Sequence, residues 1–338
     1  VTGGSTVVAV LDSGVDTDHA DLADDLIHQE CLLDTNGVID GIGGCPNGSD
    51  RQSGAGAAED DHGHGTHVTG IITSKGTRSS VGVAPGAKIV AIKIINNSSN
   101  FSYFSEIVAA LDFIINNRPD VKVINMSIGT YALFNGDCDN ATAYNMAAAA
   151  AINTLRTNGV IAFAASGNDG SGTSMSSPAC LSNVVSVGAT YKNDSIASFT
   201  NSNASLDVMA PGVSINSTYL ANGTTTASGT SMASPHAAGC AALLIDAGVA
   251  VTPDQIETRL KSSSVQVTDP TNGLTFPRIR CYNYAPALSY SSESGYVNDG
   301  VNPNSGTAST SFSYKVVYTD ADNDPPASLN VHIDVNTT

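Results

Sequence analysis

The chain has 338 residues, and at roughly 150 residues a domain this length suggests about two domains. Hydrophobic residues make up 41% of it and charged residues 13%, which supports a sizeable core and excludes a disordered chain or a coiled coil. With 14 Lys and Arg residues against 31 Asp and Glu residues the net charge is −17, so the surface repels nucleic acid and anionic lipid, and neither is expected as a partner.

The sequence offers no segment for membrane insertion or export. No charge-free apolar stretch approaches the roughly 18 residues that a membrane span needs, and Val1 leads directly into a strand-like run rather than a signal peptide. We therefore expect a mature or trimmed form of a soluble, acidic protein without a membrane span.

Short apolar runs alternate with longer helical patterns as far as residue 288. Runs rich in Val and Ile predict buried strands, which cover residues 7–11, 88–95, 121–126, 160–165 and 184–187.

Helices are predicted between and after these strands. The spacing of apolar residues indicates helices over residues 105–117, 141–157 and 231–247. A further helix begins at Thr252, where Thr-Pro-Asp-Gln supplies an N-cap, a Pro at the first position and a Gln at the third. The alternation predicts an α/β fold with an open parallel sheet, whose ligands gather beyond the carboxyl ends of the strands.

The composition changes after Leu288. Residues 289–306 are rich in Ser, Gly and Asn and are predicted to form a linker or loop. Alternating apolar residues then predict two half-buried strands, at 312–318 and 329–335, on either side of an Asp-rich loop. About 50 residues are too few for a complete β-sandwich of roughly 100. We therefore predict one domain at residues 1–288, and a linker with a partial β-sandwich-like module at residues 289–338.

Three segments carry residue types that acyl transfer requires. Asp12 follows the first predicted strand, His64 opens an apolar helical segment, and Ser231 opens another. Each alone has a structural explanation, because Asp after a strand caps turns and Ser before a helix serves as its N-cap. Together they supply a nucleophile, an imidazole to take its proton and a carboxylate to fix the imidazole tautomer.

The surroundings of Ser231 suit a nucleophile. A helix start leaves backbone N–H groups free beside the serine, and Gly229 permits a tight approach of the chain. Pro235 is expected in the first helical turn, where its missing N–H costs nothing.

A fourth segment, Ser-Gly-Asn-Asp-Gly at residues 166–170, ends a buried predicted strand in a turn of small residues. The side chain of Asn168 can donate to an oxyanion there, together with the Ser231 N–H. The alternative is that Asn168 simply tolerates a left-handed turn.

On these motifs the chain resembles the subtilases, the subtilisin-like serine proteases. The matching stretches lie in family order: residues 9–14, 64–68, 82–85, 125–129, 166–170 and 229–236. The resemblance implies a three-layer subtilisin-like fold, with a central, mostly parallel sheet flanked by helices. A short β-rich C-terminal segment follows it here.

The resemblance also implies roles for particular residues. Asp12 would be the orienting acid, His64 the general base, Ser231 the nucleophile and Asn168 the oxyanion donor. Two cleft walls would pair with the substrate backbone and bound the pocket for the P1 residue, which precedes the cleaved bond. These walls would be formed by Ser127, Ile128 and Gly129 and by Ala165, Ser166 and Gly167.

A metal site is the alternative for the histidines at His62, His64 and His67, whose spacing places them close together. The glycines beside His64 suit a helix start, and the family motif selects His64 as the base and leaves His67 inside the core. The chemistry requires no cofactor. Calcium would be structural, and the family's usual site is in doubt because residues 71–81 lack an Asn-rich loop and only 11 residues precede Asp12.

The C-terminal loop holds a weaker metal candidate, formed by Asp320, Asp322 and Asp324. Calcium accepts oxygen ligands from such flexible loops, but the pattern is not that of an EF-hand. A solvated acidic turn is the favoured alternative.

Six cysteines without a Cys-x-x-Cys pair argue against zinc and for disulfides in an exported protein. The alternative is six buried thiols in a cytosolic protein. Spacing alone cannot choose among the 15 pairings that six cysteines allow. The subtilase fold favours Cys138–Cys180, which would tie the two cleft walls together, and Cys240–Cys281, which would anchor the Ser231 helix to the end of the domain. Cys31–Cys45 would close a local loop.

The expected function is that of a secreted or extracellular serine endopeptidase that forms an acyl-enzyme with protein or peptide substrates. Because Gly129 and Gly167 leave room, Phe, Tyr, Leu or Met is expected at P1 rather than a charged residue. We expect a monomer, with its own propeptide as the folding partner and inhibitor that the resemblance implies. The C-terminal region would attach it to a cell surface. The rivals are a catalytically idle subtilase scaffold used for binding and a peptidase restricted to one precursor.

Overall fold

The computed structural model describes residues 1–34, 43–96 and 104–281, together with short strands in the rest of the chain. The chain divides into two compact units, Val1–Cys281 and Tyr282–Thr338.

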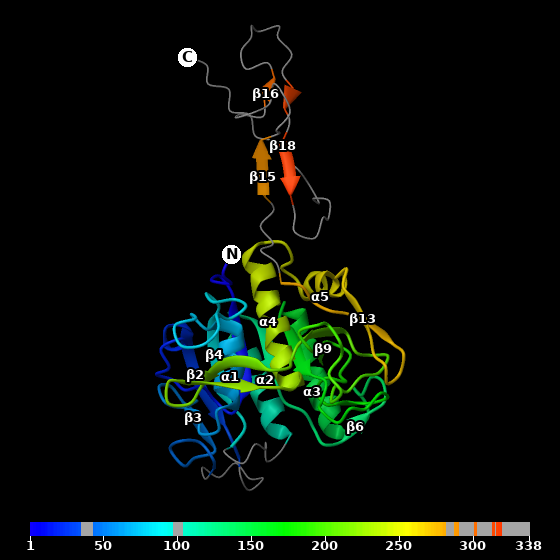
Figure 1. Ribbon diagram of the computed structural model, residues 1–338. Helices are drawn as coiled ribbons and strands as arrows, with labels where there is room; N and C mark the ends of the chain where they lie inside the picture. The colour runs from blue at the N-terminus through cyan, green and yellow to red at the C-terminus, as the bar shows by residue number, and fades with distance from the viewer. Residues whose placement is uncertain are drawn as a thin grey trace, which may run out of the picture. The chain divides into compact units, whose positions relative to one another are not determined.

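A central sheet organises the first unit (Figure 1). Its strand order is β10-β9-β7-β5-β1-β4-β2-β3, and all neighbours pair in parallel except β2 and β3. The strands are β1 Val7–Asp12, β2 Leu26–Leu32, β3 Arg51–Ser53, β4 Lys88–Lys93, β5 Val121–Met126, β7 Ile161–Ala165, β9 Val184–Thr190 and β10 Val208–Pro211.

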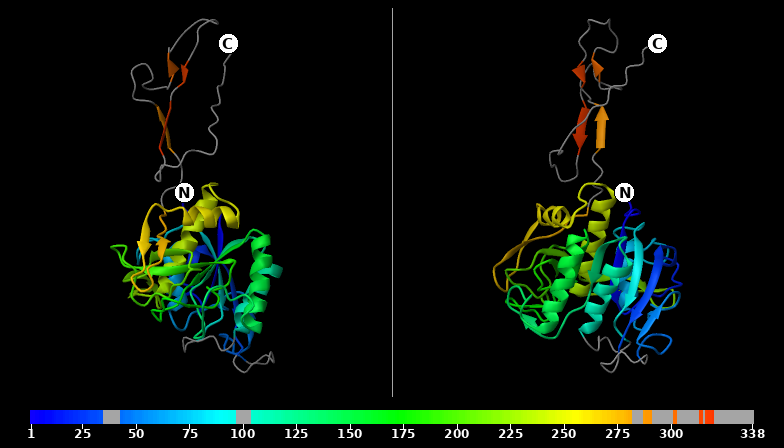
Figure 2. Two further views of the ribbon diagram at one scale, coloured as in Figure 1. Left: turned by 90° about the vertical axis from the view of Figure 1, so that its right-hand side faces the viewer. Right: turned by 180° about the vertical axis from the view of Figure 1, so that it is seen from behind.

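Helices cover both faces of this sheet (Figure 2). α1 (His64–Thr73) and α4 (Thr230–Asp246) pack together on one face, and α2 (Ser105–Asn117) and α3 (Ala143–Thr157) pack on the other. This confirms the predicted three-layer α/β fold. The strands β1, β7 and β9 are mostly apolar and are buried along almost their whole length, because both of their faces are covered.

The helix ends follow local chemistry. The backbone N–H of Arg118 bonds to the Ile114 carbonyl at the end of α2, and Pro119 follows and cannot continue the helix. α5 (Pro253–Lys261) has the expected capping box between Thr252 and Gln255, with Pro253 at its first position. A short 3₁₀ helix, η1, spans Ala23–Asp25.

Three small antiparallel ladders in this unit were not predicted from the sequence, because their strands are short or polar. They pair β6 Leu133–Phe134 with β8 Met175–Ser176, β11 Ile215–Tyr219 with β12 Gly223–Ala227, and β13 Gln266–Thr268 with β14 Thr275–Pro277.

In the second unit, β15 (Ala287–Tyr290) pairs antiparallel with β18 (Val316–Thr319), and β16 (Val301–Asn302) pairs with β17 (Ser313–Tyr314). The prediction of a linker or loop over residues 289–306 is therefore wrong at residues 289–290 and 301–302, which lie in β15 and β16 and pair with strands later in the chain. The predicted boundary after Leu288 falls within β15.

Some predictions for the second unit concern residues outside the described part of the chain. These are the strand at 329–335 and the acidic loop with Asp320, Asp322 and Asp324.

Three disulfides link the cysteines in the pairs expected from the fold: Cys31–Cys45, Cys138–Cys180 and Cys240–Cys281. The second joins the segments that follow β6 and β8, where the Cys138 N–H also donates to the Cys180 carbonyl at 2.9 Å. The third ties α4 to the last residue of the first unit. Among the described residues, no helix is both long and apolar enough to span a membrane.

A buried carboxylate closes the loop that follows α1. Asp21 is inaccessible to solvent and accepts hydrogen bonds from the backbone N–H groups of Thr77, Arg78 and Ser79, at 2.7, 2.9 and 2.9 Å. Burial alone would raise the pKa of Asp21, but these donors outweigh it and lower the pKa from 3.8 to about 2. The ionised carboxylate therefore holds the loop in place.

The lowered pKa of Asp21 predicts a pH-dependent contribution to stability. Because the folded pKa lies below the unfolded value, the stabilisation is complete above about pH 4 and is lost as the pH falls towards about 2. Asp21→Asn should reduce the free energy of unfolding at pH 7 by on the order of 2 kcal/mol, the usual contribution of hydrogen bonds to a charged group. Thermal unfolding of both proteins from pH 7 to pH 3 should show the difference shrinking, with exposed Asp24→Asn as the control. A difference independent of pH would contradict the assignment.

Candidate active site

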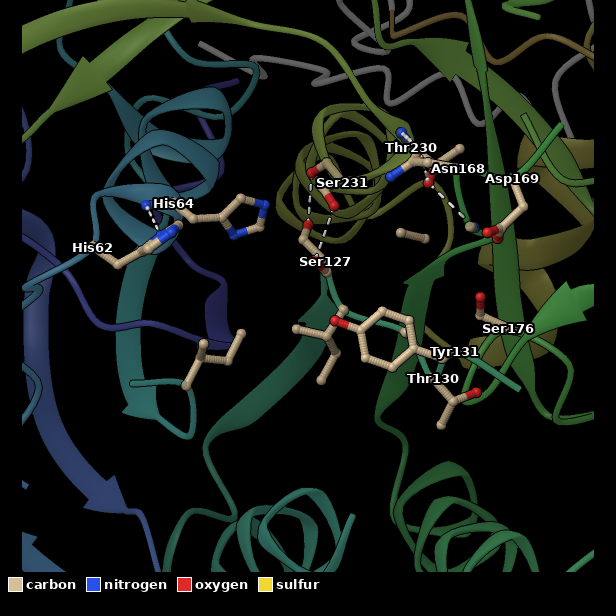
Figure 3. Close-up of a pocket in the computed structure, with 15 residues that line it drawn as sticks. His62, His64, Ser127, Thr130, Tyr131, Asn168, Asp169, Ser176, Thr230 and Ser231 are labelled. Carbon is tan, nitrogen blue, oxygen red and sulfur yellow. Dashed lines mark hydrogen bonds between the residues drawn. The ribbon is translucent and has the colours of Figure 1, made fainter. Parts of the chain in front are cut away.

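The predicted site residues meet at the carboxyl edge of the sheet. Asp12 ends β1, Ser127 follows β5 and Asn168 follows β7, while His64 and Ser231 lie in the first turns of α1 and α4. A pocket opens between them (Figure 3). It is lined by His62, His64, Ile95, Ser127, Ile128, Gly129, Thr130, Tyr131, Ala165, Gly167, Asn168, Asp169, Ser176, Thr230 and Ser231.

A hydrogen bond of 2.7 Å joins Asp12 Oδ1 to His64 Nδ1. Asp12 is 1% exposed, and the same oxygen accepts from the Ser13 N–H. Because a carboxylate only accepts, Nδ1 carries the proton and Nε2 of neutral His64 is left as the basic nitrogen.

The surroundings raise the pKa of His64 above its usual 6.5. Burial, the largest influence, lowers the pKa, but the charge and hydrogen bond of Asp12 and the charge of Asp60 together outweigh it. His64 is therefore a stronger base than an isolated imidazole, and it is neutral only above the raised pKa.

Asp60 organises the helix start that carries His64, and the prediction missed it. Its Oδ1 accepts from the N–H groups of His62 (3.0 Å) and Gly63 (2.9 Å), and its Oδ2 accepts from the N–H and hydroxyl of Thr66. Gly63, the N-cap, has no side chain to do this and adopts a φ of +95°. The signal in the sequence was an acid placed shortly before a glycine-rich helix start.

Lys93 is a second feature that the sequence analysis missed. It ends β4 in register with Asp12 on β1 and is 1% exposed. Its ammonium donates to the Ser13 carbonyl at 2.6 Å and to Asp61 Oδ1 at 2.7 Å. This buried cation thus fixes the turn that follows Asp12.

Ser231 lies opposite His64, whose ring points towards it (Figure 3). The Ser231 hydroxyl donates to the Ser127 carbonyl at 3.0 Å rather than to His64. A rotation about the Cα–Cβ bond of Ser231 is therefore needed to bring its proton to His64 Nε2.

The side chain of Asn168 has a fixed orientation. Its Oδ1 accepts from the Thr230 N–H at 2.9 Å and from the Thr230 hydroxyl at 3.0 Å, which leaves Nδ2 as the end that can donate within the pocket. The alternative of a left-handed turn at Asn168 is wrong, because the positive φ falls on Gly167, at +111°.

Five of the six residues expected in the cleft walls line the pocket, and Ser166 does not. Ser166 is fully buried, with its N–H bonded to the Val187 carbonyl and its own carbonyl bonded to the Ser176 N–H. Ser176 itself lines the pocket, and a Cβ placed on Gly129 would come within 2.8 Å of its Cβ. Tyr131 is 93% exposed at the pocket and was missed because nothing in its local sequence marks it.

The nearby histidine His67 lies inside the domain. It is 1% exposed, and its Nε2 is 3.1 Å from the Ile215 carbonyl and 3.3 Å from the Thr225 carbonyl. Burial lowers its pKa below 6.5 despite these two acceptors. No group of His, Cys, Asp and Glu among the described residues is arranged to hold a metal ion.

Comparison with known proteins establishes the family. The model of the subtilase family matches residues 3–297, so the chain belongs to this family of serine endopeptidases. It is 35% identical to Subtilisin DY of Bacillus licheniformis over 271 residues, and 35% identical to Subtilisin Savinase of Lederbergia lenta over 268 residues. Each alignment covers 79% of this chain and 86% of the relative.

Solved structures show the same relationship. The chain is similar to a cold-adapted subtilisin-like serine proteinase, with a TM-score of 0.64, 28% identity and coverage of 83% of this chain and 91% of that one. It is also similar to a protease structure from Pseudoalteromonas arctica, with a TM-score of 0.67, 28% identity and coverage of 83% and 89%. These similarities confirm the subtilisin-like fold.

The loop after α1 does not have the ligands of the structural calcium site that the resemblance to subtilases implies. The carboxylate of Asp21 faces three backbone N–H groups, and a shell of donors repels a cation. The loop is thus held by an anionic side chain that accepts from backbone amides.

The contacts of His64 predict its titration. Asp60→Asn removes one of the charges that raise the pKa of His64, so the imidazole should titrate at lower pH than in the parent. NMR of the His64 ring protons as a function of pH measures this. Asp61→Asn is the matched control, because Asp61 pairs with Lys93 and the amide oxygen can still accept that bond. An unchanged His64 titration in Asp60→Asn would contradict the electrostatic role.

Proposed function

We propose that the protein cleaves peptide bonds through an acyl-enzyme on Ser231. The observation that carries this is the 2.7 Å hydrogen bond between the buried Asp12 and His64, whose ring faces a serine in the first turn of α4. His64 Nε2 takes the proton of the Ser231 hydroxyl as its oxygen attacks the scissile carbonyl. Asp12 keeps the ring oriented and stabilises the imidazolium that forms.

The oxyanion of the tetrahedral intermediate would lie between the Ser231 N–H and Asn168 Nδ2. The anchoring of Asn168 Oδ1 by Thr230 supports this, because it directs the amide donor before the charge develops. His64 then gives its proton to the leaving amine. It next takes a proton from water as the water oxygen attacks the ester, and it returns that proton to the Ser231 oxygen as the carboxylic acid product leaves.

Substrate would lie as an extended chain between the two cleft walls. Residues 127–129 follow β5, and residues 165–167 begin at the last residue of β7, so their backbone groups lie at the carboxyl edge of the sheet. The β6–β8 ladder and the Cys138–Cys180 disulfide join the segments beyond these walls, which supports a cleft of constant width.

Two substitutions test the roles of Ser231 and Asn168. In subtilisin, where these effects were measured, loss of the nucleophile lowers turnover by about 10⁶ and loss of the oxyanion Asn by about 10²–10³. We expect Ser231→Ala to leave almost no hydrolysis of casein, and Asn168→Ala to leave weak but measurable hydrolysis. Equal losses would make Asn168 structural.

The same experiment separates the peptidase from an idle scaffold used for binding. A serine-directed phosphonylating reagent should label the parent at Ser231, and peptide mapping should locate the label. Labelling at any other residue, or undiminished proteolysis by Ser231→Ala, would refute the assignment.

The pocket supports a preference for large apolar P1 residues. Ile128 and Ala165 form apolar lining and Ser176 contributes a small side chain, while the Asp169 carboxylate already accepts from Asn201 at 2.9 Å. Cleavage of a mixed peptide library should favour Phe, Tyr, Leu or Met at P1. Ser176→Val should lower kcat/KM for Phe at P1 by about tenfold and change Ala at P1 little. Dominant cleavage after Lys or Arg would contradict this.

We also propose that the enzyme is secreted. Three disulfides support this, because such bonds persist in oxidising compartments. Action as a monomer with its own propeptide as folding partner remains part of the proposal. So does a separate C-terminal module that attaches the enzyme to a surface or substrate. A form ending at Leu288 that keeps activity on small peptides would support the separate module.

A further inference from the structure

A proline interrupts the hydrogen bonding of the helix that carries the nucleophile. α4 runs from Thr230 to Asp246 with Pro235 inside it. In an α-helix the carbonyl of Ser231 would accept from the N–H four residues later, but Pro235 has none, and a proline ring pushes that carbonyl aside. The expectation that the missing N–H costs nothing is therefore wrong, because Pro235 lies beyond the residues whose N–H groups are free at a helix start.

The side chain of Ser127 supplies the missing donor. Its hydroxyl donates to the Ser231 carbonyl at 2.7 Å, and the Ser231 hydroxyl donates back to the Ser127 carbonyl at 3.0 Å (Figure 3). These two bonds join the cleft wall after β5 directly to the first turn of α4.

Two buried polar residues hold the Ser127 hydroxyl in this orientation. Asn125 Nδ2 donates to Ser127 Oγ at 3.0 Å, and the Ser234 hydroxyl donates to Asn125 Oδ1 at 2.7 Å. Asn125 and Ser234 are both 0% exposed, and Ser127 is 2% exposed. Because Asn125 fills the acceptor position of Ser127 Oγ, the Ser127 proton is left to the Ser231 carbonyl.

We propose that the Ser127 side chain, oriented by Asn125 and Ser234, is a positioning device that replaces the helix bond lost at Pro235. It fixes the peptide plane that follows Ser231, and with it the placement of the Cα–Cβ bond about which the hydroxyl rotates towards His64. The proposal rests on the proposed function of Ser231 and adds a role for the Ser127 hydroxyl beyond its backbone role in the cleft wall. A misplacement of about 1 Å at a reacting atom costs on the order of 10² in rate.

A double-mutant cycle tests the compensation directly. Ser127→Ala removes the hydroxyl and keeps the cleft-wall backbone, and Pro235→Ala returns an N–H to the Ser231 carbonyl. We expect Ser127→Ala to lower kcat about 10-fold to 100-fold with KM changed less than about threefold. Adding Pro235→Ala should restore most of the lost kcat, so the two effects should be strongly non-additive.

The measurements are kcat and KM on one small peptide, the rate of phosphonylation of Ser231, and the thermal midpoint of each variant. Ser186→Ala is the matched control, because Ser186 is a fully buried serine of β9 whose hydroxyl donates to Asp207 at 2.8 Å, and it does not line the pocket. It should lower the thermal midpoint and leave kcat unchanged. A purely structural Ser127 would behave in the same way, and that result would overturn the proposal.

Hydrogen exchange gives a readout that does not depend on activity. The amides of the first turn of α4 should exchange faster in Ser127→Ala and recover in Ser127→Ala/Pro235→Ala. If the parent is active and labelled at Ser231 but the effects of Ser127→Ala and Pro235→Ala on kcat are additive, only the positioning role is overturned. If the parent is not labelled at Ser231, the proposed function itself is overturned. Unchanged exchange in Ser127→Ala would overturn the positioning role in either case.

Discussion

The parallel alignment of the central strands is what brings the site residues together. Because β1, β5 and β7 run in the same direction, their carboxyl ends meet at one edge, and residues far apart in the chain come together there. Asp12 and Ser127 lie close together because they stand at the carboxyl ends of β1 and β5. Helices α1 and α4, which pack together on one face of the sheet, begin at the same edge, and His64 and Ser231 therefore face each other.

Each helix start at this edge is held by side chains from elsewhere in the fold. Asp60 binds the N–H groups that lead into α1, and Thr230 at the start of α4 is joined to Asn168. The N-caps of both helices are glycines, which leave room but have no side-chain oxygen to accept from the helix N–H groups. The polar partners therefore do two things at once, since they satisfy buried backbone groups and orient the groups that face the substrate.

Much of the fold was predictable because apolar periodicity reports burial. The helix at 105–117 was predicted with its observed bounds, and the strands at 7–11 and 121–126 were found because both faces of the sheet are covered. The ladders around the pocket were not predicted. Their strands are short and their stability comes from partners distant in sequence, as for Met175–Ser176 against Leu133–Phe134.

The α/β class, the helix and strand pattern of the first unit, and the motifs around Asp12, His64, Asn168 and Ser231 were predictable from the residue order, because each depends on neighbours within a few residues. The groups that support these motifs became evident only in the folded chain. The buried Lys93, the amide cage of Asp21 and the bond from Ser127 to the Ser231 carbonyl join residues 80, 56 and 104 positions apart. A buried polar group needs a hydrogen-bond partner, and in this protein the partner lies far away in the sequence. Local sequence patterns therefore cannot predict these pairs.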